Sequence, residues 1–428
     1  MRTHDVAAIG AGPFNLGLAA LAAPVDDVDV VCFDRSPELT WHRGLMLDGS
    51  LLQVSFLADL VTLVDPTSPY SFLSYLRDQD RMYLFYVRES FHPTRQEYED
   101  YLRWVARRVP GLRFGHDVLE VGYDERSDLF DVHLRTGITS RVEHARHVLL
   151  GVGTEPRLPD ALRALPRERV VHTADFLHRL DDITHAGRVT VVGSGQSGAE
   201  VVLDLLRRRT AGQQLAWLTR TESFAPLDYS KLVLEMTTPE YVDHFHALAE
   251  DRRDALVRAQ WRHYKGISTA TLDEIHDALY TRCLDEKAAP VELRTAVEVA
   301  AATAGEDVTL TLAHADTGEV TTHRTDLVIA ATGYAERPMP LSAGLRQRLH
   351  TDRSGRLVVH RDHSVSADGA LDGRLFVANA DLHSHGPAAP DLGLGAVRNA
   401  GIVNRVAGRE VYPLPRRTAF TTFRAATG

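Results

Sequence analysis

Short apolar runs alternate with amphipathic stretches along most of the chain, a pattern typical of α/β proteins. Residues 6–9 and 28–33 are apolar and rich in valine, so they predict two buried strands. Residues 16–23, between them, carry small and apolar side chains and predict a helix packed on those strands. The start of the chain thus predicts a β–α–β unit of a parallel sheet.

The same order recurs near the middle of the chain. Residues 188–192 predict a strand, residues 199–208 a helix and residues 215–219 the next strand. The remaining pattern is weaker. It predicts helices over 96–108, 239–284 and 395–406, an alternating sheet region over 112–150, and strands at 308–312, at 326–330 and from 375 onward.

These elements predict an α/β fold with two Rossmann-like units, the second inserted into a discontinuous first one. The breaker-rich segment 151–156 is the expected crossing point. We expect the first unit to span 1–155 and 326–428. The inserted unit would span 156–325 and include a smaller, mostly helical segment at about 236–285.

A glycine-rich turn follows the first strand of each predicted unit. In the earlier one, Gly10 suits a tight turn, and Gly12 lets the backbone approach a pyrophosphate at the start of a helix. Asn15 stands where a third glycine is usual. Asp34 ends the next strand, where an acid binds a ribose hydroxyl. A tight strand–helix turn without a ligand is the alternative, but the surrounding pattern favours dinucleotide binding.

The later turn keeps three glycines, Gly193, Gly195 and Gly198. The strand that follows it ends in Arg220 rather than in an acid. An arginine at this place suits a 2′-phosphate, which favours NADPH over NADH. A solvated strand-end arginine is the alternative. Two dinucleotide sites on one chain indicate two redox cofactors, one of which reduces the other.

Composition narrows the class of protein further. The net charge of −10, with 44% hydrophobic and 25% charged residues, is ordinary for a globular protein and argues against nucleic acid and membrane surfaces as partners. Cys32 and Cys283 are too few for a disulfide framework or a thiolate metal site, and we expect no metal. No apolar run approaches the roughly 20 residues that span a bilayer. The first strand begins near the first residue, so we expect a cytoplasmic protein without a signal peptide.

Several blocks spread over the sequence form a characteristic set: residues 10–16, Trp41-His42, Gln53, Phe56-Leu57, 59–62, 69–72, Arg95 with Tyr98, Tyr101 and Trp104, 331–334, and His385-Gly386. Together these blocks resemble the flavin-dependent N-hydroxylating monooxygenases of siderophore biosynthesis, the lysine N6-/ornithine N5-hydroxylase family. The resemblance runs from end to end, and its nearest branches are aerobactin-type lysine hydroxylases and desferrioxamine-type diamine hydroxylases.

This resemblance implies FAD and NADPH as cofactors and a two-stage reaction. NADPH reduces FAD, O2 forms a C4a-hydroperoxyflavin, and a neutral primary amine attacks it to give a hydroxylamine. It also implies a homo-oligomer, either a dimer or a tetramer. Gln53 corresponds to a glutamine placed against flavin and substrate, although a turn-capping glutamine is the alternative. The cofactor-binding residues implied beside the glycines are Pro13, Trp41, His42, Gln196, Ser197, Thr332, Gly333 and Tyr334.

Two positions concern the substrate. The amino-acid hydroxylases of this family carry lysine where this chain has Ala58, and serine where it has Gly393; both pair with the substrate carboxylate. A buried carboxylate without a partner is costly, so their loss favours a diamine such as cadaverine or putrescine. Asp381 and Asp391 are candidates for the distal ammonium. An arginine from elsewhere could still hold a carboxylate, which leaves L-lysine or L-ornithine as the alternative substrate.

Other classes fit less well. The chain has no Cys-x4-Cys pair, which excludes a disulfide reductase of the two-dinucleotide type. The block at 59–75 argues against flavin monooxygenases that oxidise carbonyl or sulfur groups. A catalytically inactive flavin-binding module is a remote alternative, because both glycine turns are intact.

Overall fold

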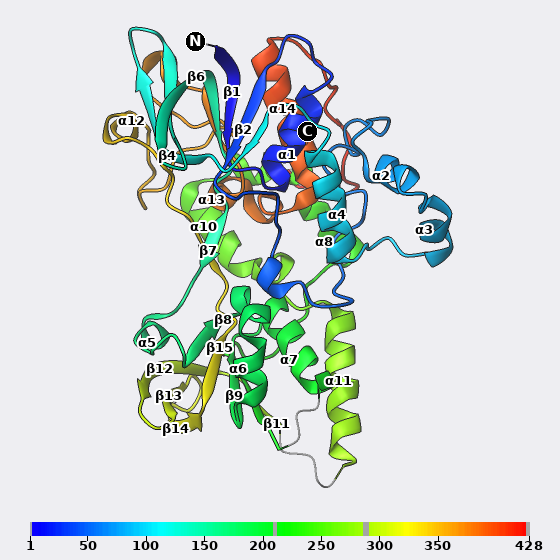
Figure 1. The fold of residues 1–428 in the computed structure, drawn as a ribbon, viewed down its shortest axis with the longest axis vertical. Helices are drawn as coiled ribbons and strands as arrows, with labels where there is room; N and C mark the ends of the chain where they lie inside the picture. The colour runs from blue at the N-terminus through cyan, green and yellow to red at the C-terminus, as the bar shows by residue number, and fades with distance from the viewer. Residues whose placement is uncertain (1, 209–211, 286–290, 425–428) are drawn as a thin grey trace.

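The computed structural model describes residues 2–208, 212–285 and 291–424. Its two main sheets lie at opposite ends of the long axis (Figure 1). In the larger sheet the order is β3-β2-β1-β6-β5-β4. Strands β1, β2, β3 and β6 pair in parallel, whereas β4 and β5 extend β6 antiparallel. The bounds are β1 (Thr3–Ile9), β2 (Val30–Asp34), β3 (Leu112–Phe114), β4 (Asp117–Asp124), β5 (Leu129–Thr136) and β6 (Thr139–Leu150).

Helix α1 (Pro13–Ala22) packs on one face of this sheet beside α14 (Leu392–Ala407). Its small, buried side chains allow this close approach. The other face is covered by apolar residues from the segment 341–377. Strand β17 (Leu375–Val377) pairs with β6, so the end of the chain returns to the first sheet. We call these parts together the first half.

The second sheet is entirely parallel, with the order β11-β10-β9-β15-β8. Its strands are β8 (Val170–His172), β9 (Arg188–Val192), β10 (Gln214–Leu218), β11 (Val291–Arg294) and β15 (Leu327–Ala330). Helix α7 (Gln196–Arg208) follows β9 and packs against α11 (Thr269–Cys283). An antiparallel sheet of β12 (Val297–Ala304), β13 (Val308–His314) and β14 (Val320–Thr325) lies beside it. We call this inserted part the second half.

The chain crosses between the halves on two short strands. Strand β7 (Thr154–Pro156) leads into the second half, β16 (Tyr334–Glu336) leads back, and the two pair antiparallel (Figure 1). The fold class expected from the sequence is therefore confirmed. Strand β15 belongs to the second sheet although it follows residue 325, because it completes the parallel pairing with β8 and β9. We propose that the inserted part extends to the crossing strand β16.

The remaining helices surround these sheets. The polar segment expected to be helical over 239–284 is divided into three helices, of which α9 and α10 contact α13 of the first half, while α11 contacts α7. No helix in the described ranges is both long and apolar enough to cross a bilayer. The bounds are α2 (Phe72–Asp78), α3 (Met82–Arg88), α4 (Arg95–Ala106), α5 (Asp160–Arg163), α6 (Leu180–His185), α8 (Lys231–Leu234), α9 (Pro239–His246), α10 (Glu250–Ala259), α12 (Ala343–Gln347) and α13 (Leu382–His385).

Candidate active site

The first glycine-rich turn connects β1 to α1. Gly10 has a φ of 99°, its N–H donates to the carbonyl of Phe33 at 2.7 Å, and a Cβ on it would lie 2.5 Å from the carbonyl oxygen of Gly151. Gly12 differs, because no heavy atom lies within 4 Å of where its Cβ would be. Pro13 then starts the helix. Packing therefore requires glycine at position 10, whereas the space beside Gly12 is open to a ligand.

Two polar side chains hold this turn in place. Asn15 is buried, and its amide donates to the carbonyls of Ile9 and Gly10, both at 2.9 Å. The Asp34 carboxylate accepts the N–H groups of Ala11 and Ser36, both at 2.8 Å. An open backbone at the positive end of a helix, with an acid at the end of the next strand, fits the pyrophosphate and ribose of FAD.

The second turn connects β9 to α7. Gly193 has a φ of 119°, and a Cβ on it would lie 2.1 Å from the carbonyl oxygen of Ala331. A Cβ on Gly198 would lie 2.5 Å from the carbonyl oxygen of Gly193. Gly195 is open, with only the Lys265 carbonyl oxygen at 4.0 Å. Ser197, half-buried in the first turn of α7, lies beside this open backbone. The second turn also fits a dinucleotide.

Three exposed cations gather near this turn: Arg157, Arg220 and Lys265. Burial, and then the charges of Arg220 and Arg157, lower the pKa of Lys265. Within the described parts of the chain, no carboxylate forms an ion pair with any of them. Arg157 is tied to the turn after β15, since its N–H donates to Gly333 at 3.0 Å and its carbonyl accepts the hydroxyl of Thr332. A cluster of unpaired cations beside an open glycine turn suits the phosphates of NADPH.

The two halves meet through a hydrogen-bonded set that we call the cross-boundary network, made of Gln53, Arg95, Gln196 and Glu200. The Gln53 amide donates to Oε1 of Gln196 at 3.1 Å, and Arg95 forms an ion pair with Glu200 at 2.9 Å. Gln53 and Arg95 belong to the first half, Gln196 and Glu200 to helix α7. The network borders a cavity of about 760 Å³ whose walls come from both halves.

Aromatic rings from both halves also meet here. Trp41 lies 4.8 Å from His42, and the Tyr334 ring lies 6.4 Å from His42 and 5.2 Å from His172, centroid to centroid. His42 has a left-handed φ of 53°, and the residue is exposed to solvent although many protein atoms surround its ring. Protein atoms crowd its ring, and this desolvation together with Arg95 lowers the pKa of His42 to about 4. His42 is therefore neutral at physiological pH.

The two substrate positions identified in the sequence lie side by side. A Cβ on Gly393 would lie 3.7 Å from the Cβ of Ala58 and 2.9 Å from Oδ1 of Asp391. Asp391 caps helix α14 by accepting the N–H of Gly393 at 2.7 Å. Burial raises the pKa of Asp391, while the N–H groups of Gly393 and Leu394 oppose that shift. Burial and the nearby Asp391 carboxyl raise the pKa of Tyr229, which lines the cavity.

Asp381 lies elsewhere than the sequence suggested. It is fully buried, its Oδ2 lies 2.7 Å from Nδ1 of His363 and 3.5 Å from Nδ1 of His385, and those two rings stack at 4.0 Å. Burial opposes ionisation, but Arg398 and the two histidines lower the pKa of Asp381. Asp381 thus belongs to an internal charge network, although its Oδ1 has no hydrogen-bond partner among the described residues, and its assignment to the distal ammonium stays a prediction. Sequence spacing indicated only part of this network: Asp381 and His385 lie four residues apart, whereas His363 and Arg398 come from separate segments.

The sequence analysis also missed Glu200. It lies one helical turn after Gln196, so both side chains project from the same face of α7. That spacing was a usable signal, but only the tertiary structure brings Arg95 against it.

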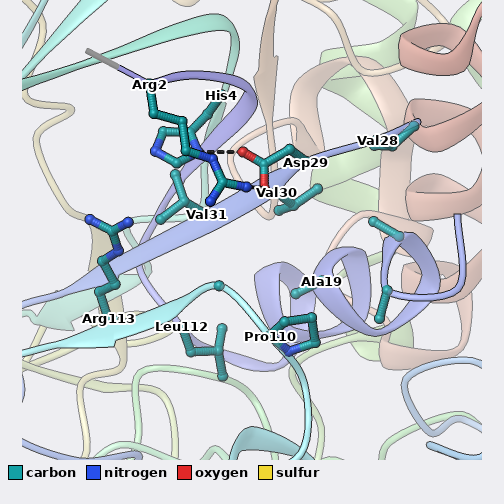
Figure 2. A pocket seen from close by; sticks show the side chains of 13 residues that line it. Arg2, His4, Ala19, Val28, Asp29, Val30, Val31, Pro110, Leu112 and Arg113 are labelled. Atoms are coloured by element: carbon teal, nitrogen blue, oxygen red, sulfur yellow. Dashed lines mark hydrogen bonds and ion pairs between the residues drawn. The ribbon is translucent and has the colours of Figure 1, made fainter. Parts of the chain in front are cut away.

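A second cavity, of about 350 Å³, lies at the far end of the first sheet (Figure 2). It is bordered by Arg2, His4, Asp29 and Arg113, close to where β1 and β2 begin. Ligands of parallel α/β sheets bind at the carboxyl ends of the strands, where both glycine turns lie. This position separates the second cavity from the candidate active site.

Comparisons with known proteins agree with this geometry. A family model described as L-lysine 6-monooxygenase/L-ornithine 5-monooxygenase matches residues 2–336. The chain is 38% identical to a putrescine N-hydroxylase of Shewanella oneidensis, over 98% of this chain and 84% of that protein. It is 41% identical to the rhizobactin siderophore biosynthesis protein RhbE of Rhizobium meliloti, over 99% and 95%.

Among solved structures, the chain resembles DfoA bound to FAD, the cadaverine monooxygenase of the desferrioxamine pathway of Erwinia amylovora. The TM-score is 0.96 and the identity 39%, with both chains fully covered. The ornithine N-hydroxylase KtzI of Kutzneria sp. 744, solved with reduced FAD, NADP+ and L-ornithine, has a TM-score of 0.88 and 26% identity, over 95% of this chain and 99% of that one.

Proposed function

This chain belongs to the L-lysine 6-monooxygenase/L-ornithine 5-monooxygenase family, and from that premise we propose that it hydroxylates one primary amine of an aliphatic diamine. The enzyme is a flavin-dependent N-hydroxylating monooxygenase that uses FAD and NADPH. Bound flavin supplies the activation of O2 after reduction by NADPH. The protein's own task is to bind the cofactors, to orient the amine and to keep water away.

The position of Asp391 carries the proposal for a diamine. At the place where the amino-acid hydroxylases provide a lysine and a serine, this chain has the small residues Ala58 and Gly393 and the carboxylate of Asp391. A substrate carboxylate here would meet a like charge in a partly desolvated place, whereas an ammonium would meet an opposite one. We assign Asp391 to the distal ammonium, with the Tyr229 side chain beside it.

The reacting amine needs its lone pair, although an alkyl ammonium titrates near pH 10 in water. Desolvation favours the neutral amine, because a buried cation without a partner is costly. Gln53, at the cavity wall, is the side chain that we assign to orienting this amine by accepting one of its N–H groups. A diamine therefore keeps one charged end at Asp391 and presents one neutral end near Gln53.

Hydroxylation of L-lysine or L-ornithine is the second candidate, and Arg398 favours it. This buried arginine has no hydrogen-bond partner for Nε or Nη1 among the described residues. Arg398 is therefore a candidate for the arginine that would hold the carboxylate of an amino-acid substrate. Against this, it already interacts with both Asp381 and Asp391 and lies over the Phe14 ring at 4.8 Å.

Product-resolved hydroxylamine formation distinguishes the two. The purified enzyme would be supplied with NADPH, FAD and O2, and with cadaverine, putrescine, L-lysine or L-ornithine in parallel. We expect hydroxylamine from the diamines. Preference for an amino acid would refute the diamine assignment, and peroxide alone with all four would show that the true amine lies outside this set.

Variants of the Asp391 site sharpen the test. Asp391→Asn keeps the helix cap but removes the charge, so KM for the diamine should rise about 30-fold, since charged hydrogen bonds contribute about 2 kcal/mol. Ala58→Lys should raise it as well, because the new ammonium would pair with Asp391. Ala58→Met is the matched control for size. An equal effect of Met and Lys would show that charge is not what matters.

We also propose that the product enters hydroxamate siderophore assembly in the cytoplasm, and that copies of the chain associate. The roles of the relatives in siderophore biosynthesis support the proposal about the product.

The exposed surface of helix α3 supports the proposal that copies of the chain associate. This helix exposes four large side chains, Tyr83, Leu84, Tyr86 and Val87, each more than 70% exposed. Soluble monomers rarely leave such a patch uncovered. Light scattering on the wild type and on Leu84→Glu tests this: loss of an oligomer only in the variant is expected, and a monomeric wild type would refute it.

A further inference from the structure

The amide of Gln196 has only one orientation compatible with its neighbours. The hydrogen-bonding groups around the amide determine this orientation. The backbone N–H of Ser268, at 2.8 Å, can only donate, so it faces Oε1. An ionised Glu200 carboxylate, at 2.8 Å from Nε2, can only accept.

The orientation of the Gln196 amide determines that of the Gln53 amide. The Gln53 amide lies 3.1 Å from Oε1 of Gln196, and because this oxygen can only accept, the neighbouring atom of Gln53 must be a donor. Gln53 must therefore turn its NH2 group toward Gln196. Its own Oε1 then points away from Gln196, and no described residue donates to it. Since Gln53 borders the cavity, this oxygen is free for a ligand.

Glu200 keeps its charge through Arg95. The Glu200 and Arg95 side chains are only 6% and 13% exposed and lie 2.9 Å apart. Burial raises the pKa of Glu200, and the charge of Arg95 opposes that rise. A neutral Glu200 could donate its proton, and the orientation of Gln196 would then be less strongly determined.

We infer that Glu200, paired with Arg95, is a positioning residue: it acts through Gln196 to direct the carbonyl oxygen of Gln53 into the cavity. The inference rests on the proposed role of Gln53. A carbonyl oxygen accepts an N–H of the neutral amine and leaves the lone pair free to react. An NH2 group in the same place would donate to that lone pair and withhold it. The network thus selects which end of the Gln53 amide meets the substrate.

A double-mutant cycle tests this inference. Glu200→Gln and Gln53→Ala would be made singly and together, and hydroxylamine formed per NADPH oxidised would be measured. The amine would be whichever of the four the wild type hydroxylates best, so failure of the diamine assignment does not affect the test. If Glu200 acts through Gln53, Glu200→Gln should lower the yield about tenfold alone but less than about twofold in the Gln53→Ala background.

The control is Asp326→Asn, which weakens an ion pair to Arg188 at 2.6 Å within the second half. It should leave the yield unchanged in both backgrounds. Flavin content and the thermal midpoint report folding. If Glu200→Gln does not fold, Glu200→Asp replaces it in the same cycle. The shorter side chain keeps a negative charge near Arg95 but moves the carboxylate away from Nε2 of Gln196. Equal losses with and without Gln53, or no loss at all, would overturn the inference.

Discussion

The two glycine-rich turns have the same place in their sheets but are stabilised differently. In the first, the Asn15 side chain takes the place of the third glycine and binds two carbonyls, and Asp34 binds the turn from the next strand. In the second, Gly198 packs directly on Gly193, and the next strand is followed by Arg220, which forms no ion pair with any described carboxylate. Ser194 adds hydroxyl contacts to Thr219 and Thr221 at 2.7 and 3.1 Å.

This difference separates two requirements of a dinucleotide-binding turn, its backbone geometry and its recognition of the ligand; we call them the first and the second demand. One is the tight backbone, for which Gly10 and Gly193 are required by close approach and positive φ in both turns. The other is the ligand, for which the strand-end residue matters: an acid in the first turn and an arginine in the second. The first demand is shared, whereas we propose that the second distinguishes an FAD site from an NADPH site.

The largest expected effect comes from Gly10→Ala. Its left-handed φ and the 2.5 Å approach to the Gly151 carbonyl should together cost about 4 kcal/mol of unfolding free energy and abolish FAD retention. Gly49→Ala is the control, because its φ of 76° carries similar strain but its surroundings are open; it should cost about 1 kcal/mol. Chemical denaturation and flavin absorbance measure both. Equal costs would show that the close approach is unimportant.

Asn15→Gly gives the first turn the three-glycine form of the second. It leaves the carbonyls of Ile9 and Gly10 without their donor, so we expect a loss of about 2 kcal/mol, together with weaker FAD binding. NADPH affinity, measured by titration, should not change. An unaltered stability would mean that the two turns are interchangeable.

Arg220→Gln addresses the ligand demand. Loss of one cation near the 2′-phosphate should raise KM for NADPH about tenfold, equivalent to about 1.4 kcal/mol, and leave KM for NADH unchanged. Arg35→Gln, next to Asp34 at the first turn, is the matched control and should not alter the NADPH to NADH ratio. If both coenzymes weaken equally, Arg220 does not bind the 2′-phosphate.

The smallest effect concerns two histidines, one from each half, that contact Tyr334. The folded-state pKa of His42 is about 4, below its ordinary value of 6.5, and burial lowers that of His172 as well. The unfolded chain therefore binds more protons between pH 6.5 and 4, and stability should fall as pH decreases through that window. His42→Gln should flatten this dependence more than His172→Gln. Denaturation midpoints at several pH values measure it, and an unchanged slope in His42→Gln would contradict the expectation.

The sequence predicted the elements that have strong local signals. Strand β9 has the expected bounds, and α7 begins a few residues earlier than expected because Gln196 directly follows the turn. The boundary at residue 325 stays a prediction; the short apolar strand β15 follows it but pairs with β8 and β9, and such a strand does not indicate from its sequence which sheet it joins. Of the candidate site residues, the glycines could be found from local pattern. The burial of Asp381 could not, because its partner His363 lies 18 residues away and shows no regular spacing.

The sequence by itself determined the two dinucleotide turns, the insertion of one unit into the other, and the absence of lysine and serine at positions 58 and 393. These are properties of local pattern and of residue identity. The tertiary structure alone decided that Asp391 lies beside Ala58 and Gly393, that Asp381 pairs with His363, and that Arg95 and Glu200 join the halves. Such pairings arise from packing between distant segments, and a one-dimensional pattern carries no record of which segments pack together.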